Sequence, residues 1–193
     1  TIREWIKDRP TVVIGSAWEE DMSLLIPLIQ SKPEWLWIIA PHALDALAMD
    51  RWASALGVPT QKYSLWKGVQ DPQILFIDNI GMLSSLYQFA HFAYVGGGFG
   101  KGLHNILEPL GFGIPVIFGN PRRASKFPEA AQSQLEGCGF GVTSFAELQQ
   151  CVHQLEQPEF YLKSTAAAQH WVKANLGAAD RILAHLTTST SSK

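Results

Sequence analysis

Glycines, a lysine, a histidine, an asparagine and a glutamate gather in one short segment of the chain, 95-VGGGFGKGLHNILEP-109, which we call the glycine segment. Glycines let backbone N–H groups approach a phosphate because no Cβ is in the way, and the start of a helix adds a positive end that favours an anion. A carboxylate such as Glu108 can accept hydrogen bonds from the two hydroxyls of a ribose. These residue types therefore indicate a nucleotide site.

Structural roles are the alternative explanation for the same residues. A dense glycine cluster can form a bend without any ligand, and Glu108 can stabilise a helix N-terminus by about 0.3–1 kcal/mol through the helix dipole alone. His104 or Asn105 is expected to cap a helix that starts near residue 105, since Pro109 is tolerated only in the first turn. Because Lys101, Asn105 and Glu108 accompany the glycines, we favour the nucleotide site.

Apolar runs and segments of helical spacing alternate along the chain and must position these residues. Runs rich in Val, Ile and aromatic residues recur at 11–15, 35–40, 73–77, 91–95 and 114–118. They lack strict polar alternation, as expected for strands that are covered on both faces. Segments of helical spacing lie at 20–30, 44–56, 82–90, 106–112 and 125–135. The alternation predicts an α/β fold, a doubly wound Rossmann-like parallel sheet with flanking helices.

Helical patterns dominate the chain after Gly141. Ser144 and Glu147 form a capping-box pattern at the start of a helix over 144–155. Further helices are expected over 159–175 and 178–186, followed by a frayed tail. We therefore divide the chain into a residual linker or helix (1–10), a Rossmann-like binding domain (11–158), and C-terminal helices with a tail (159–193).

Composition excludes several classes of function. The net charge of −2, from 15 basic and 17 acidic residues, argues against general nucleic-acid binding. Cys138 and Cys151 form no CxxC pair, and no HExxH motif is present, so neither a metal nor another cofactor is expected. No apolar run reaches the roughly 18 residues that span a bilayer. We expect this segment itself to be soluble and to lie in a reducing, cytoplasmic setting.

Three further groups of residues are expected to be structural. The acidic residues Glu19, Glu20 and Asp21 follow the first strand and are interpreted as acid enrichment at a helix N-terminus. Four histidines on strand or helix surfaces are assigned structural roles: His91, His153, His170 and His185. The seven tryptophans are too many to place all of them in a core, so some are expected to pack against a neighbouring domain.

The glycine segment resembles the donor-binding half of GT-B glycosyltransferases, in particular the 3-deoxy-D-manno-octulosonic acid (Kdo) transferase family. In that family a GG(S/T/G)F…GGHNxLEP block is followed by a GxPVxxGP strand, and GGGFGKGLHNILEP and GIPVIFGN match these motifs here. Upstream, VVIGSAWEED and WLWIIAPH are similar to the family's GSTHxxE and PRHP segments. The resemblance covers roughly residues 11–142.

The resemblance implies a donor site for CMP-Kdo. Gly97 and Gly98 would line the donor phosphate with Asn105 beside them, and Glu108 would hold the CMP ribose. Phe99 is, from its own position in the loop, a candidate lid over the donor, and packing on its own domain is the alternative. Together, the resemblance and the residues themselves give this expected donor site: Ser16, His42, Gly97, Gly98, Phe99, Lys101, Gly102, His104, Asn105, Glu108, Arg123 and Lys126.

Two departures from the family pattern concern charge. The arginine of the PRHP segment is absent, since Pro41 is followed directly by His42, and the acidic residue of the family's GEL motif is Met82. Positive charge for the phosphate would then come from Lys101, or from the basic cluster that contains Arg123 and Lys126.

The resemblance also implies what lies outside this chain. Kdo transferases move Kdo from CMP-Kdo to lipid A precursors, in lipopolysaccharide core biosynthesis at the cytoplasmic face of the bacterial inner membrane. Their general base belongs to an N-terminal acceptor domain, which also carries the membrane anchor, and nothing in this sequence aligns with it. We expect a donor-binding domain without catalytic residues of its own; a nucleotide-sugar epimerase or a noncatalytic nucleotide-binding module is the alternative.

Overall fold

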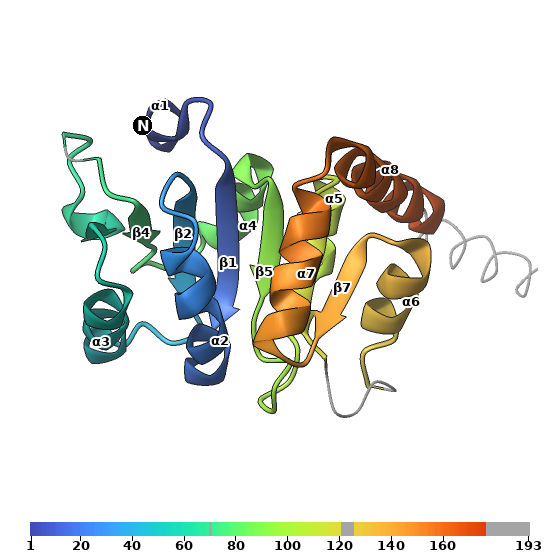
Figure 1. Cartoon of the computed structure of the whole chain (residues 1–193), viewed down its shortest axis with the longest axis horizontal. Coiled ribbons are helices and arrows are strands. Elements are labelled where there is room, and N and C mark those ends of the chain that lie inside the picture. Colours follow the sequence, from blue (N-terminus) through green and yellow to red (C-terminus); the bar gives the residue numbers. More distant parts are fainter. Residues whose placement is uncertain (70, 121–125, 177–193) are drawn as a thin grey trace, which may run out of the picture.

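One parallel sheet organises the chain, whose computed structural model describes residues 1–69, 71–120 and 126–176. The described part contains seven strands in the order β3-β4-β2-β1-β5-β6-β7 (Figure 1). All of the strand pairs are parallel. The strands are β1 (Thr11–Ala17), β2 (Leu36–Pro41), β3 (Thr60–Lys62), β4 (Ile74–Phe76), β5 (Phe92–Val95), β6 (Val116–Gly119) and β7 (Gly139–Val142).

Helices cover both faces of the sheet, as a doubly wound fold requires. One face packs against α2 (Glu19–Gln30), α3 (Ala46–Leu56) and α7 (Phe145–Leu155), which lie in front of the sheet in Figure 1. The other face packs against α1 (Ile2–Ile6), α4 (Leu83–Leu86), α5 (Leu107–Gly111), α6 (Pro128–Glu136) and α8 (Pro158–Asn175). Alternate residues of β1 divide between the two cores, with Val12 and Ile14 in the first and Val13 in the second.

The predicted fold class is confirmed, and two strands were missed. Each of the five apolar runs forms a strand, in β1, β2, β4, β5 and β6. The missed strands, β3 and β7, are the two edges of the sheet. β3 reads TQK and is only half-buried, and β7 reads GFGV, so neither contains an apolar run. An edge strand has one partner and less cover, and its sequence therefore shows a weaker strand signal.

Several predicted helices differ in extent from those observed. The segment 82–90 forms only four α-helical residues, which continue into a 3₁₀ turn at Tyr87–Phe89. The helix predicted over 125–135 begins at Pro128, a residue well suited to a first helical turn. Ser144 caps α7 as predicted, but the Glu147 carboxylate accepts hydrogen bonds from the N–H and hydroxyl of Thr143 instead of closing the box on Ser144. The helix predicted over 178–186 lies outside the described residues.

Most tryptophans belong to the core, and two of the seven lie outside it, so the expectation that not all of them are core residues is confirmed. Five of them are at most 6% exposed: Trp5, Trp35, Trp37, Trp52 and Trp171. Trp18 and Trp66 are half-buried. The high tryptophan count is therefore explained mainly by packing within this chain.

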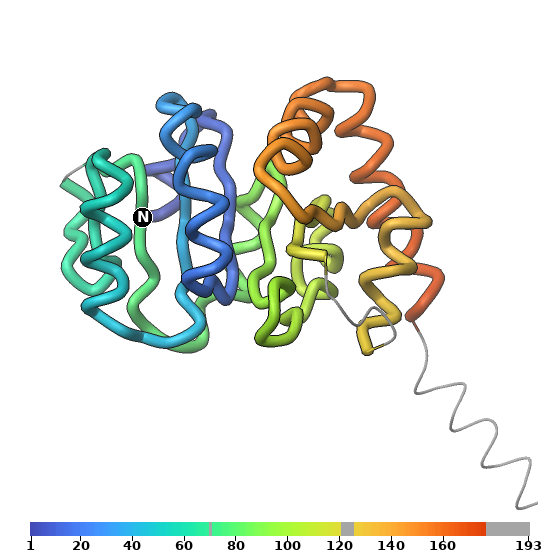
Figure 2. Tube along the Cα trace, turned by 60° about the horizontal axis from the view of Figure 1, so that its bottom comes forward, coloured from blue at the N-terminus to red at the C-terminus, as the bar shows by residue number. Residues whose placement is uncertain are grey.

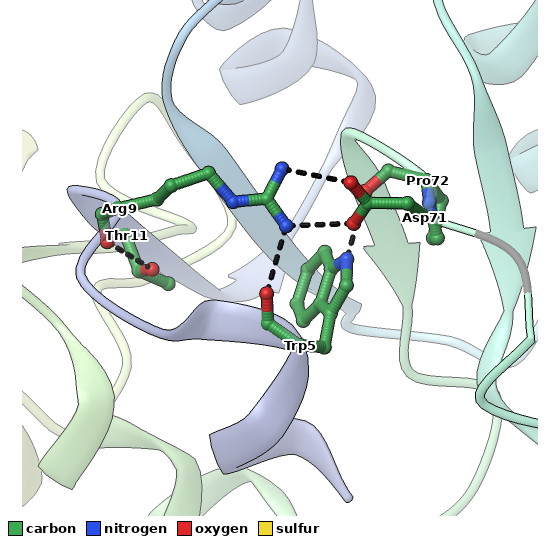
Figure 3. Close-up of polar contacts among 5 residues, drawn as sticks. All are labelled: Trp5, Arg9, Thr11, Asp71 and Pro72. Carbon is green, nitrogen blue, oxygen red and sulfur yellow. Dashed lines mark hydrogen bonds and ion pairs between the residues drawn. The ribbon is translucent and has the colours of Figure 1, made fainter.

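Trp5 fastens α1 to the loop before β4 (Figure 3). Its indole Nε1 donates a buried hydrogen bond of 2.9 Å to the carbonyl oxygen of Pro72. Beside it, the Arg9 guanidinium binds the Asp71 carboxylate at 2.6 Å and also donates to the carbonyl oxygen of Trp5. The Asp71 side chain is 69% exposed, so this ion pair contributes little to stability. The buried hydrogen bond of the indole therefore contributes more than the ion pair to holding α1 in place.

We expect Trp5→Phe to lower the free energy of unfolding by about 1–3 kcal/mol, because it leaves a buried carbonyl without its donor. Asp71→Ala removes only the exposed ion pair and should cost less than about 1 kcal/mol. Urea denaturation of the two variants measures both values. Equal losses would show that the exposed ion pair stabilises α1 as much as the buried indole does, which would contradict this ranking.

His91 makes the stability of the fold depend on pH. Its ring stacks on Tyr161 at 4.0 Å between centroids, and its Nε2 lies 3.3 Å from the carbonyl oxygen of Leu155. Burial lowers the pKa of His91 below its ordinary value. The unfolded chain, with a histidine pKa of about 6.5, therefore takes up the proton first as the pH falls. This contribution is complete above that pKa and is lost as the pH falls towards the folded-state value.

We expect the melting temperature to fall between pH 7 and pH 5, with at most about 1.4 kcal/mol lost per pH unit for each such histidine. His91→Phe retains a ring for the stack on Tyr161 and should reduce this slope. Replacement of the exposed His170 by glutamine is the matched control and should leave it unchanged. Calorimetric scans across this pH range decide the point, and an unaltered slope in His91→Phe would contradict the assignment.

Candidate functional site

The glycine segment lies at the point where the order of the strands in the sheet reverses. From β1 the chain proceeds to β2 on one side, whereas β5 and β6 extend the sheet on the other. The carboxyl ends of β1 and β5 are neighbours there, and ligands of doubly wound sheets bind at such switch points. Figures 1 and 2 show the turn after β5, in yellow-green, beyond the carboxyl ends of the central strands and beside the end of β1.

The turn after β5 closes on itself through backbone hydrogen bonds. The Gly97 carbonyl oxygen accepts from the N–H groups of Gly100, at 3.3 Å, and Gly102, at 2.9 Å. The His104 N–H donates to Gly96. Within the described part of the chain, the N–H groups of Gly98, Phe99 and Lys101 have no hydrogen-bond partner; Gly98 is buried, Phe99 half-buried and Lys101 exposed.

Three glycines of this turn are required by contacts within the protein. A Cβ on Gly96 would overlap the carbonyl oxygen of Ser16 at the end of β1, and a Cβ on Gly98 would overlap the carbonyl oxygen of Gly119 at the end of β6. Gly97 has a φ of +92°, in the region that favours glycine. The absence of side chains therefore serves close backbone packing against both neighbouring strands, whether or not a phosphate is present.

Asp21 holds this turn, a role that the sequence analysis missed. The side chain is 1% exposed. Its Oδ2 accepts from the N–H groups of Gly97 and Trp18, each at 3.0 Å, and its Oδ1 accepts from the Tyr94 hydroxyl at 2.9 Å. Burial raises the pKa of Asp21, and these three hydrogen bonds oppose that rise. The Gly97 N–H, expected to line a phosphate, is therefore already used by a carboxylate.

The three acidic residues after β1 therefore differ in burial and in role. Glu19 and Glu20 are exposed in the first turn of α2, as acid enrichment predicts, whereas Asp21 is buried. Its position three residues after Trp18, the N-cap of α2, is typical of a capping carboxylate. Nothing in the local pattern indicates its contacts with Tyr94 and Gly97, which depend on β1 lying next to β5.

Four side chains from three loops form a ring cluster beside this turn. The Trp18 indole stacks on His42 at 4.0 Å between centroids, and His42 lies 4.6 Å from His104. The indole Nε1 donates to His104 Nε2 at 3.4 Å, and Lys101 Nζ lies 5.5 Å from the indole centroid. Burial, aided by the neighbouring His42, lowers the pKa of His104. His42, Lys101 and His104 thus come together as expected of one site, around a tryptophan that was not predicted to belong to it.

Asn105 and Glu108 are joined at the start of α5. Asn105 Nδ2 donates to Glu108 Oε1 at 3.2 Å, and Asn105 Oδ1 accepts from the Leu107 N–H at 3.0 Å. The predicted cap was misplaced, because the N-cap is Ile106, which makes no side-chain hydrogen bond, and the helix extends only from Leu107 to Gly111. Asn105 instead fixes both the first turn and the carboxylate of Glu108.

The remaining predicted residues lie around this centre. Ser16, the last residue but one of β1, has a φ of +53° and lies where the register between β1 and β2 shifts. Phe99 packs over Gly119 and lines a pocket of about 560 Å³ together with Glu20, Ser23, Leu24, Asn120 and Thr143. Lys126 is exposed, next to Phe127, whose ring would lie 3.8 Å from a Cβ on Gly102. Arg123 lies outside the described residues.

Two negative findings apply to residues 1–69, 71–120 and 126–176. They contain no group of three or more His, Cys, Asp or Glu side chains placed to hold a metal ion. None of their helices has the length and apolar character needed to cross a membrane.

Sequence comparison finds several relatives named 3-deoxy-D-manno-octulosonic acid transferase. No protein-family model matches the chain. It is 28% identical over 162 residues to the 3-deoxy-D-manno-octulosonic acid transferase of Chlamydophila psittaci, covering 79% of this chain and 36% of that protein. It is 30% identical over 138 residues to the transferase of the same name from Chlamydia pneumoniae, covering 68% of this chain and 31% of that protein. The chain thus spans about a third of the length of these relatives.

Solved structures agree on the fold. The C-terminal CMP-Kdo binding domain of WaaA from Acinetobacter baumannii matches with a TM-score of 0.74 at 22% identity, over 87% of this chain and 92% of that chain. WaaG, a glycosyltransferase involved in lipopolysaccharide biosynthesis, matches with a TM-score of 0.60 at 15% identity, over 91% of this chain and 46% of that chain. A UDP-N-acetylglucosamine 2-epimerase reaches 0.57 at 14% identity, over 91% and 44%. The chain is therefore a relative of the 3-deoxy-D-manno-octulosonic acid transferases, with the fold of the C-terminal half of a GT-B glycosyltransferase.

Proposed function

We propose that the chain is the donor-binding domain of a Kdo transferase and that it binds CMP-Kdo at the switch point between β1 and β5. The observation that carries the proposal is the pairing of two complementary features at one place. Unpaired N–H groups at Gly98, Phe99 and Lys101 suit a phosphate, and a carboxylate fixed by Asn105 suits a ribose. The two sequence relatives described above, which are named Kdo transferases, support the choice of nucleotide and sugar.

Each part of the donor has a proposed partner. The phosphate is bound by the N–H groups of the turn after β5, with positive charge from Lys101 and Lys126. The ribose hydroxyls donate to Glu108. The ring cluster of Trp18, Lys101, His42 and His104 borders the phosphate position and offers imidazole and ammonium donors to the acidic sugar. Ser16, Phe99 and Gly102 border the same position in this proposal.

The proposed reaction is completed by groups outside the described residues. A hydroxyl of a lipid A precursor attacks the anomeric carbon of Kdo, a general base takes the hydroxyl proton, and CMP leaves. The residues of this chain act on the leaving group, where preorganised N–H donors and cations stabilise developing negative charge. We place the acceptor site, the base and the membrane contact, at the cytoplasmic face of the inner membrane, in another part of the protein. We retain the division at residues 10 and 158 as part of this proposal.

A nucleotide-sugar epimerase is the second candidate, because an epimerase that acts on a UDP-sugar shares the fold. The two candidates differ in the base that the site must accept. Calorimetric titration of the chain with CMP, UDP and GDP distinguishes them. We expect weak binding with a preference for CMP. A clear preference for UDP would favour the epimerase, and a chain that bound none of the three would leave the glycine segment with a structural role only.

A further inference from the structure

Asp21 is the single buried charged side chain in the described part of the chain. It accepts hydrogen bonds from three places: the start of its own helix α2 at Trp18, and, from far along the chain, strand β5 at Tyr94 and the glycine turn at Gly97. No ion pair with Asp21 is present among the described residues. Burial of a carboxylate without a cation is costly, and its three neutral donors offset only part of that cost.

The buried carboxylate of Asp21 is not explained by its contribution to stability. An apolar side chain in the same place would avoid the desolvation of a charge. Positions that break a folding rule in this way occur at functional sites. Asp21 lies directly behind the turn whose free N–H groups form the proposed phosphate site.

The contact with Gly97 determines which N–H groups remain free. Asp21 takes the Gly97 N–H, while the Gly97 carbonyl takes those of Gly100 and Gly102. The peptide groups on both sides of Gly97 are thereby fixed, and the donors of Gly98, Phe99 and Lys101 remain. Gly96 leaves room for this contact, since a Cβ there would lie 2.6 Å from Asp21 Oδ2.

We propose that Asp21, supported by Tyr94, is a positioning residue for donor binding: it holds the glycine turn in the conformation that leaves these N–H groups open to the phosphate. The inference rests on the proposed function, because it assumes that an anion binds this turn. Asp21 has 1% exposure and all of its hydrogen bonds lie within the protein, so it acts through the turn and does not touch the donor.

The role is geometric, and an isosteric amide therefore tests it. In Asp21→Asn, the amide oxygen can accept from Trp18 and Gly97, while the amide nitrogen donates to the Tyr94 hydroxyl, which then acts as acceptor. We expect Asp21→Asn to bind CMP within about threefold of the wild type, since no charge reaches the ligand. Asp21→Ala releases the turn and should weaken CMP binding by about 10- to 100-fold, the size of effect that a small misplacement produces. Tyr94→Phe, which removes one of three hydrogen bonds, should fall between them.

Two readouts separate positioning from general destabilisation. Leu148→Ala removes a fully buried side chain of α7, outside the glycine segment; it should lower the melting temperature and leave CMP affinity unchanged. Hydrogen exchange of the Gly97 and Gly102 amides should accelerate in Asp21→Ala and Tyr94→Phe but not in Asp21→Asn. Wild-type CMP affinity or unaltered exchange in folded Asp21→Ala would overturn the proposal, as would an equal loss of affinity in Leu148→Ala.

A wrong assignment of the proposed function would give a different result from a wrong assignment of Asp21. If the wild type bound no nucleotide, the donor site itself would be wrong, and Asp21 would have no donor to position. The exchange measurement would then still decide whether Asp21 holds the turn. If Asp21→Ala failed to fold, Tyr94→Phe would decide the question through the same two measurements.

Discussion

Replacement of Glu108 by alanine weakens CMP binding by about 1–3 kcal/mol, or roughly 5- to 150-fold in Kd, if the carboxylate accepts the ribose hydroxyls. Asn105 holds Glu108 Oε1 at 3.2 Å, which leaves the second carboxylate oxygen for a ligand. Only a small loss of stability is expected, because the helix dipole of a five-residue helix offers Glu108 at most about 0.3–1 kcal/mol. Calorimetric titration gives the affinity, and thermal melts give the stability.

A second ligand makes this test specific for the ribose. 2′-Deoxy-CMP lacks one of the proposed donors, so it should bind the wild type more weakly than CMP, and Glu108→Ala should no longer distinguish the two ligands. Glu159→Ala, an exposed carboxylate in the first turn of α8, is the matched control and should bind both ligands as the wild type does. If Glu108→Ala lost stability but kept its affinity, Glu108 would be a helix-capping residue and nothing more.

The sequence predicted the central part of the fold because burial on both faces has a simple signature. Strands such as β1 and β2 must be apolar along their whole length, and continuous runs of Val, Ile and Trp reveal them. The edge strands β3 and β7 are under no such requirement, and their polar or glycine-rich sequences carry too little signal. The order of the strands could not be predicted from local sequence patterns, because it is determined by packing between distant segments.

In the candidate site, too, contacts between residues close in sequence could be predicted, and contacts between distant segments could not. Residues close together in sequence, such as Asn105 and Glu108, were predicted as neighbours because helical spacing relates them. The contact of Asp21 with Gly97 and that of Trp18 with His104 span 76 and 86 residues. They exist because β1 and β5 are adjacent, and no periodicity encodes that adjacency.

The glycines themselves illustrate a limit of motif-based inference. A glycine after a strand suits a phosphate, but it also suits a second backbone that comes close. Here both neighbouring strands approach the turn after β5, at Ser16 and at Gly119. The need for glycine at these positions therefore cannot by itself indicate a ligand, and the nucleotide site must be argued from the free N–H groups and from Glu108.

Gly98→Ala should accordingly destabilise the protein even in the absence of any ligand. The added Cβ would overlap the carbonyl oxygen and the backbone carbons of Gly119, so the end of β6 or the turn must move. Overpacking of this kind costs about 1–3 kcal/mol, and more where backbone must shift. For a chain of this size that corresponds to a fall in melting temperature of about 2–4 °C per kcal/mol. Calorimetry of the ligand-free protein measures it.

Gly111→Ala is the matched control, because a Cβ there meets no atom within 4 Å and the residue lies in α5. Alanine in a helix restricts the unfolded chain and should stabilise the protein by about 0.4–1 kcal/mol. Opposite signs for the two variants would establish that packing against β6 requires Gly98. Equal melting temperatures would mean that the turn does not pack on β6, and the requirement for glycine would then have to come from the bound donor.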